Sequence, residues 1–197
     1  IRALTLKEVK TYDCGSLVNP RFPEQVVQPG ERIPTFEEFL IWLNREKNPR
    51  AKKVLLNVET KSEPSHPEFT PDPKTFSKMV IDMMKKYKVF KRSTLQSFDF
   101  RNLTAAREID PKVTISALIE DRPSESLVTV VSRIKANIIS PNHEWLTKQD
   151  VEALHKAKIK VIPWTANTVA DWKKLVEFEV DGIISDNPKE LLSFRGQ

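Results

Sequence analysis

Glycine is scarce in this sequence, and its scarcity excludes the commonest nucleotide-binding sites. Only four glycines occur among 197 residues, and no Gly-x-Gly-x-x-Gly or Gly-x-x-x-x-Gly-Lys run is present. Those runs let the backbone approach a phosphate closely at the start of a helix, so their absence excludes a dinucleotide-binding fingerprint and a P-loop.

Cysteine pairs, zinc motifs and long apolar runs are also missing. The single cysteine, Cys14, cannot form an internal disulfide, which fits a reducing compartment and equally a periplasmic protein that uses none. No Cys-x-x-Cys or His-Glu-x-x-His motif is present, which argues against zinc. The longest apolar runs, such as residues 54–56, are far too short to span a bilayer. No secretory leader is visible, so the localisation stays open between cytoplasmic and periplasmic or secreted, with any targeting segment expected upstream.

The charges favour an anionic small molecule as the partner, not a nucleic acid. The formal net charge is +5, but lysine and arginine alternate with aspartate and glutamate along most of the chain. A nucleic-acid site needs clustered basic residues with aromatic residues between them. A mildly positive field still attracts an anionic substrate. Nothing in the pattern predicts the oligomeric state.

Strand-like and helix-like segments alternate from about residue 34 to the end. Expected strands cover residues 54–59, 94–98, 114–119, 136–140, 160–164 and 182–185. Expected helices start at residues 35, 73, 101, 124, 147, 168 and 188. Near-continuous apolar strands that alternate with helices predict a parallel α/β sheet, either doubly wound or a (β/α)₈ TIM barrel. The barrel is favoured because the dinucleotide-binding fingerprint is absent.

The first 33 residues differ from the rest, since they hold three prolines and two glycines and show little periodicity after Val9. We therefore expect a loop-rich segment at 1–33 and the barrel part at 34–197. A second proline-rich stretch, residues 62–73, is expected to be a long loop after a strand.

Capping residues define several helix starts. Thr35 with Glu38, and Thr147 with Asp150, are spaced as capping pairs, and Asp72 precedes Pro73. The helix that starts at residue 73 is expected to bury Phe76, Met79, Val80, Met83, Met84 and Tyr87.

In a barrel, reacting groups lie at the carboxyl ends of the strands, and the first expected strand ends in a polar series. Asn57, Glu59 and Lys61 alternate along it, so they share one face, toward the barrel mouth. A carboxylate suits a divalent metal and an ammonium suits a phosphate. The alternative is a structural salt bridge between Glu59 and Lys61.

The other strand ends carry weaker candidates, each with a structural alternative. Asp99 is expected to be a helix N-cap, and Ser97 lacks a neighbouring base and a nucleophile elbow. His143 is expected to be an exposed loop side chain without a role in the site. Trp164 is either a wall of the mouth or core packing, and Asp186 either closes the site or caps the last helix.

Five motifs in one order resemble the glycerophosphodiester phosphodiesterase family, a phospholipase C-like phosphodiesterase barrel. They lie at residues 33–38, 57–61, 96–99, 163–167 and 181–186. The Asn-x-Glu-x-Lys, Trp-Thr-x-Asn and Asp-Gly-Ile-x-x-Asp patterns are specific in combination. Residues 4–9 with 13–16 look like the family's small insertion after its third strand, and the resemblance covers essentially the whole chain.

The resemblance implies metal-dependent hydrolysis of glycerophosphodiesters to glycerol 3-phosphate and an alcohol. Glu59 takes the place of a metal ligand for one divalent cation, Mg²⁺ or Ca²⁺. Lys61 approaches the phosphate, and Trp164 lines the glycerol pocket. Phe98 and Asn167, from matching motifs, complete the implied substrate-binding residues.

The sequence departs from the family pattern in one respect. The family's His-Arg-Gly, Glu-x-Asp and His-Asp strands, which supply the catalytic histidines and further metal ligands, have no counterpart here. The barrel is therefore expected to be N-terminally incomplete, with the catalytic histidines upstream and this chain alone inactive. The alternatives are a degenerate, non-catalytic barrel that serves as a binding module, and a phospholipase D-like lyase on the same barrel.

Overall fold

The computed structural model describes residues 3–194, which fall into two compact units, Ile1–Val54 and Leu55–Gln197. The division between the compact units follows residue 54. The boundary at residue 33 between a loop-rich segment and the barrel part stays a prediction. The interpretation of residues 1–33 as a family-type insertion stays a prediction.

The first unit is mostly irregular, as its composition predicted. Its helices are α1 (Leu6–Val9), α2 (Phe36–Arg45) and the 3₁₀ turn η1 (Pro49–Lys52). The predicted capping pair is confirmed: the Thr35 side chain accepts the Glu38 N–H, and the Glu38 carboxylate accepts the Thr35 N–H. Between the helices, the chain folds back on itself at a bridge between Asp13 and Arg32.

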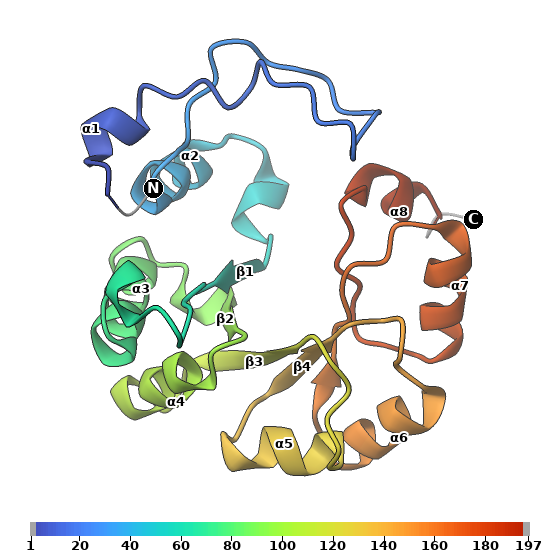
Figure 1. Cartoon of the computed structure of the whole chain (residues 1–197). Coiled ribbons are helices and arrows are strands. Elements are labelled where there is room, and N and C mark those ends of the chain that lie inside the picture. The colour runs from blue at the N-terminus through green and yellow to red at the C-terminus, as the bar shows by residue number, and fades with distance from the viewer. Residues whose placement is uncertain (1–2, 195–197) are drawn as a thin grey trace. The chain divides into compact units, whose positions relative to one another are not determined.

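The second unit contains a five-stranded parallel sheet in the order β1-β2-β3-β4-β5. The strands are β1 (Leu56–Glu59), β2 (Ser93–Ser97), β3 (Thr114–Ile119), β4 (Ile138–Pro141) and β5 (Lys160–Val161). The helices are α3 (Pro73–Lys86), α4 (Phe100–Ile109), α5 (Leu127–Arg133), α6 (Lys148–Lys156), α7 (Val169–Glu177) and α8 (Pro188–Phe194), with 3₁₀ turns η2 (Pro67–Phe69) and η3 (Phe90–Arg92). Helices α3 to α6 lie along one side of the curved sheet (Figure 1).

Strand alternation decides which side chains enter the core. Ala117, Ile139 and Val161 are adjacent in register across β3, β4 and β5, and all three are completely buried. Their neighbours along each strand point to the opposite face, where polar side chains such as Ser116 and Ser140 line cavities. The sheet is thus apolar toward the helices, and its other face mixes polar side chains with apolar ones such as Leu118 and Ile138.

The predicted α/β class with parallel strands is confirmed. The described strands form an open sheet, so closure into an eight-stranded barrel stays a prediction. Residues 182–185 do not form a regular strand, although Ile184 N–H donates to the Pro163 carbonyl and Ile184 O accepts from the Ala166 N–H. The long loop predicted at 62–73 is confirmed, with only η2 inside it.

The predicted core face of α3 is partly wrong. Ser77, Ile81 and Met84 are its buried residues, whereas Met79 is 57% exposed. The capping pair at Thr147 and Asp150 is confirmed. Within residues 3–194, no helix combines the length and apolar character needed to cross a bilayer.

Candidate active site

A cleft of about 460 Å³ opens at the carboxyl ends of the strands. β1, β2 and β3 end at residues 59, 97 and 119, and the residues immediately after them form its walls. Its lining residues are Glu59, Thr60, Lys61, Ser62, Glu63, Gln96, Phe98, Leu118, Glu120, Trp164, Thr165 and Ile184. Four of the residues singled out by the sequence (Glu59, Lys61, Phe98 and Trp164) therefore lie in one cleft, although they come from three separate segments of the chain.

Glu59 and Lys61 present free charged groups to this cleft. Glu59 is the last residue of β1, and both side chains line the cleft. Within the described residues, no hydrogen bond or ion pair reaches either side chain, and they do not pair with each other. The alternative of a structural salt bridge between them is wrong. Both groups are available to a ligand.

Asn57, which shares the strand face of Glu59, does not reach the cleft. Its amide donates to Gln96 Oε1 on β2 over 2.7 Å. This bond joins β1 to β2 beneath the cleft, so Asn57 supports the sheet while Gln96 lines the cleft floor.

Two aromatic rings form one wall of the cleft. The rings of Phe98 and Trp164 meet edge to face, with centroids 5.3 Å apart and planes at 89°. Trp164 Nε1 donates to the Ser140 carbonyl over 2.8 Å, which fixes the indole on its strand end. Trp164 is half-buried and lines the cleft, so the wall interpretation fits better than core packing.

Asn167 lies outside the set of residues that line the cleft. Its Oδ1 accepts from the Asp186 N–H and the Ser185 hydroxyl, and its Nδ2 donates to Asp186 Oδ2. Asn167 thus ties the loop after residue 164 to the loop before α8. Asn187, not Asp186, accepts the Glu190 N–H at the start of α8.

Asp99 is the N-cap of α4, as predicted, and it is nearly buried at 6% exposure. Burial alone raises the pKa of Asp99, but hydrogen bonds from Arg101 and Ser62, with the charge of Arg101, lower it below the ordinary value. The carboxylate therefore stays charged although water is excluded from it.

His143 is not the exposed side chain that the sequence predicted. Its side chain is only 13% exposed, and Nδ1 lies 3.9 Å from Asp171 Oδ1 on α7. None of His66, His143 and His155 lines the cleft.

Glu120 is a site residue that sequence reasoning missed. It follows β3, and Leu118 and Glu120 line the cleft while Ile119 between them is buried. Strand alternation continued by one residue past the apolar run of β3 would have identified it. Within the described part of the chain, no hydrogen bond or ion pair involves its carboxylate.

The cleft offers oxygen donors to a cation, but few of them. No group of three His, Cys, Asp or Glu side chains within residues 3–194 is arranged to hold a metal ion. The free Glu59 carboxylate nevertheless fits a hard divalent cation, because Mg²⁺ can bind one or two carboxylates and complete its shell with water and substrate oxygens.

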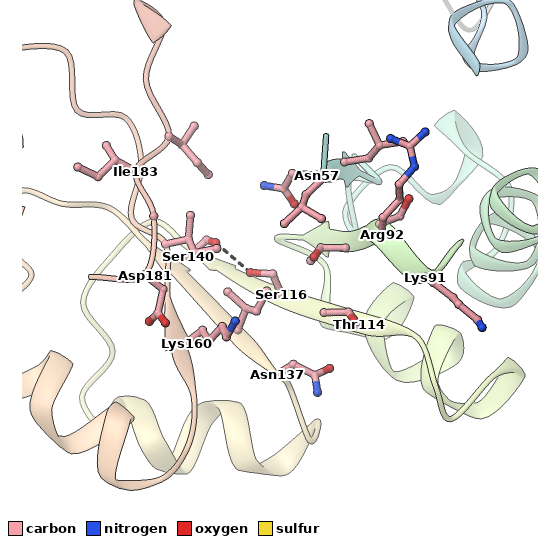
Figure 2. A pocket seen from close by; sticks show the side chains of 18 of the residues that line it. Asn57, Lys91, Arg92, Thr114, Ser116, Asn137, Ser140, Lys160, Asp181 and Ile183 are labelled. Carbon is pink, nitrogen blue, oxygen red and sulfur yellow. Dashed lines mark hydrogen bonds between the residues drawn. The ribbon is translucent and has the colours of Figure 1, made fainter. Parts of the chain in front are cut away.

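A larger cavity, about 790 Å³, lies at the opposite ends of the strands. Figure 2 shows it between Lys91 and Arg92 on one side and Asp181 on the other, over the hydrogen-bonded Ser116 and Ser140 hydroxyls. Parallel barrels place reacting groups at the carboxyl ends of strands, so size alone does not make this cavity the site.

The sequence profile of the Glycerophosphoryl diester phosphodiesterase family matches residues 1–190. The chain belongs to this family. A glycerophosphodiester phosphodiesterase of Caldanaerobacter subterraneus subsp. tengcongensis is 27% identical over 98% of this chain and 72% of its own length. A glycerophosphodiester phosphodiesterase of Bacillus subtilis is 24% identical over 93% of this chain and 62% of its own length.

Solved structures of glycerophosphodiester phosphodiesterases share the fold. A structure assigned as a glycerophosphoryl diester phosphodiesterase from Silicibacter pomeroyi is 25% identical, with a TM-score of 0.86 over 97% of this chain and 67% of its own. An Oleispira antarctica phosphodiesterase in complex with the product sn-glycerol-3-phosphate is 19% identical, with a TM-score of 0.77 over 98% of this chain and 71% of its own.

Proposed function

We propose that this chain carries part of the active site of a glycerophosphodiester phosphodiesterase, which uses water to split a glycerophosphodiester into glycerol 3-phosphate and an alcohol. The observation that carries the proposal is that Glu59, Lys61, Phe98 and Trp164 meet in one cleft at the strand ends. Membership of the family supports the reaction class.

In this proposal, the roles follow from the chemistry of each side chain. Lys61 binds the phosphate, since its ammonium lies in the cleft without an internal partner. Phe98 and Trp164 pack against the carbon face of the glycerol. Asn167 contributes indirectly, because its amide holds the loop that follows Trp164.

Glu59 is the proposed ligand for one divalent cation, Mg²⁺ or Ca²⁺. When bound, such a cation neutralises charge on the phosphoryl oxygens. Because no group of three candidate ligands occurs within residues 3–194, further ligands come from water, from the substrate and from residues beyond those described.

The family's histidine chemistry is not supplied by the described cleft, which no histidine lines. We therefore propose that residues 1–197 do not hydrolyse the substrate alone, and that a part of the protein other than this sequence supplies the histidines.

The test is release of glycerol 3-phosphate from glycerophosphocholine with Mg²⁺ or Ca²⁺. Residues 1–197 are assayed beside the longest form that the gene encodes. We expect activity only in the longer form, and we expect Lys61→Ala to lower its kcat by about 100-fold, as for the loss of one group that stabilises transition-state charge.

Each other outcome has a distinct meaning. Hydrolysis by residues 1–197 that is lost on Glu59→Ala would show that no further residues are needed. A cyclic phosphate product, visible by phosphorus NMR, would identify the lyase. Inactivity of both forms, with no binding of glycerol 3-phosphate, would favour a non-catalytic module.

A further inference from the structure

A network of buried and partly buried hydrogen bonds holds the backbone on both sides of Lys61. Residues 60 and 62, its two neighbours in the chain, are each bonded to the end of β2 or to the start of α4. These bonds join residues 37 to 40 positions apart in sequence.

On the N-terminal side of Lys61, β2 holds the backbone of Thr60. Its N–H donates to the Gln96 carbonyl over 3.0 Å, and its carbonyl accepts from the Ser97 hydroxyl over 2.6 Å. Thr60 is 1% exposed and Ser97 is completely buried. Both main-chain polar groups of Thr60 are thus satisfied where water does not compete.

On the C-terminal side of Lys61, residues at the start of α4 hold the Ser62 side chain. Its hydroxyl donates to Asp99 Oδ2 over 2.8 Å and accepts from Asn102 Nδ2, also over 2.8 Å. Asp99 is itself held by the Arg101 guanidinium, through Nε to Oδ1 at 2.9 Å and Nη2 to Oδ2 at 2.8 Å. Asn102 is completely buried, and its backbone carbonyl accepts from the Ser77 hydroxyl of α3.

Lys61 itself is bound by nothing in the described part of the chain. Its side chain is exposed, and no hydrogen bond or ion pair reaches it. The backbone from which its flexible side chain extends is therefore held by the two bonded neighbours. A phosphate-binding lysine whose backbone is held in this way loses less backbone freedom when the ligand binds.

We propose that Ser62 and Asp99 are positioning residues that hold the backbone of Lys61, and through it the lysine ammonium, in place for the phosphate. This inference rests on the proposed function of Lys61 as the phosphate-binding group. Ser62 bridges the C-terminal side of Lys61 to α4, since its hydroxyl is bonded to both Asp99 and Asn102. The Ser97 hydroxyl holds the N-terminal side, since it donates to the Thr60 carbonyl and accepts from the Asp99 N–H.

The experiment is a double-mutant cycle on the affinity for glycerol 3-phosphate with Mg²⁺, measured by calorimetry on the longest form that the gene encodes. The variants are Ser62→Ala, Lys61→Ala and the double variant. Ser62→Ala is chosen because Asp99→Ala also removes the N-cap of α4 and can prevent folding. The matched control is Ser93→Ala, which removes a buried hydroxyl bonded to the Val89 carbonyl over 2.9 Å at the other end of β2.

We expect Lys61→Ala to weaken binding about 10- to 100-fold, as for the loss of a charged hydrogen bond. We expect Ser62→Ala to weaken it at least about threefold, and to have no effect once Lys61 is alanine, because the two act through one group. Ser93→Ala binds as the unmutated protein does, and Ser62→Thr, which keeps the hydroxyl, restores binding.

Two results overturn the inference by itself: unchanged binding by Ser62→Ala, or an equal loss with and without Lys61. Unchanged binding by Lys61→Ala, or no binding by the unmutated protein, overturns the proposed function and this inference with it. The two failures are therefore distinguishable within one set of titrations.

Discussion

The edge of one ring meets the face of the other where Phe98 and Trp164 pack in the cleft, with centroids 5.3 Å apart and planes at 89°. Such a pair contributes about 0.5–1.5 kcal/mol beyond the area that it buries. The indole also donates to the Ser140 carbonyl, a bond worth about 1 kcal/mol net. Trp164 is therefore held from two directions before any ligand arrives.

Trp164→Ala is expected to lower the free energy of unfolding by about 1–3 kcal/mol, because both interactions are lost. It is also expected to weaken binding of glycerol 3-phosphate, since the proposed glycerol wall is removed. Trp164→Phe keeps a ring opposite Phe98 but loses the bond to Ser140, so its losses are smaller. Urea unfolding and calorimetric titration check the order. Equal binding by both variants and the unmutated protein contradicts the assigned wall.

Asn167 gives a second prediction, in which stability falls more than binding. Asn167→Ala removes the bonds to Ser185 and Asp186 that join two loops. Asn167→Asp places a second carboxylate beside Asp186 Oδ2, where the amide now donates. We expect the aspartate variant to have the lower melting temperature at pH 7, because two like charges then lie side by side.

Thermal unfolding of both Asn167 variants at pH 7 tests this. If Asn167→Ala weakens ligand binding as strongly as Lys61→Ala without a loss of stability, then Asn167 contacts the substrate directly, as the resemblance implied.

Two methionines of α3 provide a matched pair for core packing. Met84 is completely buried, whereas Met79, five residues earlier in the same helix, is 57% exposed. Met84→Ala is expected to cost about 2–5 kcal/mol, the range for deleting a buried large side chain. Met79→Ala is expected to stay within about 0.5 kcal/mol of the unmutated protein. Denaturant unfolding measures both, and similar losses would mean that α3 presents another face to the core.

The misassigned Met79 shows what periodicity can and cannot predict. The apolar spacing of α3 identified a helix, and Asp72 followed by Pro73 identified its start, because both signals depend on local sequence. Apolar residues occur around more of this helix than its core face needs, and the tertiary contact that selects Ser77, Ile81 and Met84 leaves no local signal. The face was therefore predictable only in part.

The cleft shows the same division between local and distant information. Alternation along β1 placed Glu59 and Lys61 on one face, and the same rule extended along β3 would have found Glu120. The network around Ser62 was not predictable, since it depends on bonds to Asp99 and Asn102 from a different βα unit. Asn167 was assigned by motif, and only the folded loops show which groups its amide binds.

The last prediction concerns pH and the first unit, where four hydrogen bonds converge on the Asp13 carboxylate. Its oxygens accept from the N–H groups of Gly15, Ser16 and Gly30 and from the Ser16 hydroxyl, at 2.8–2.9 Å. These bonds lower the pKa of Asp13 from 3.8 to about 2, and the bond from the Gly30 N–H has the largest effect. Gly15 suits this turn because a Cβ there would lie 1.8 Å from the Gln28 carbonyl oxygen.

A carboxyl group whose pKa is lower in the folded state stabilises the fold when it is ionised. The contribution of Asp13 is therefore complete above its ordinary pKa of 3.8 and is lost as the pH falls through about 2. We expect NMR titration to place the Asp13 carboxyl near pH 2, with the Gly30 amide shifting over the same range. In Asp13→Asn, the Gly30 shift should disappear. A midpoint near 3.8 in the unmutated protein would mean that the bonds to Gly30 and Ser16 do not persist in solution, and that this loop is held by its backbone alone.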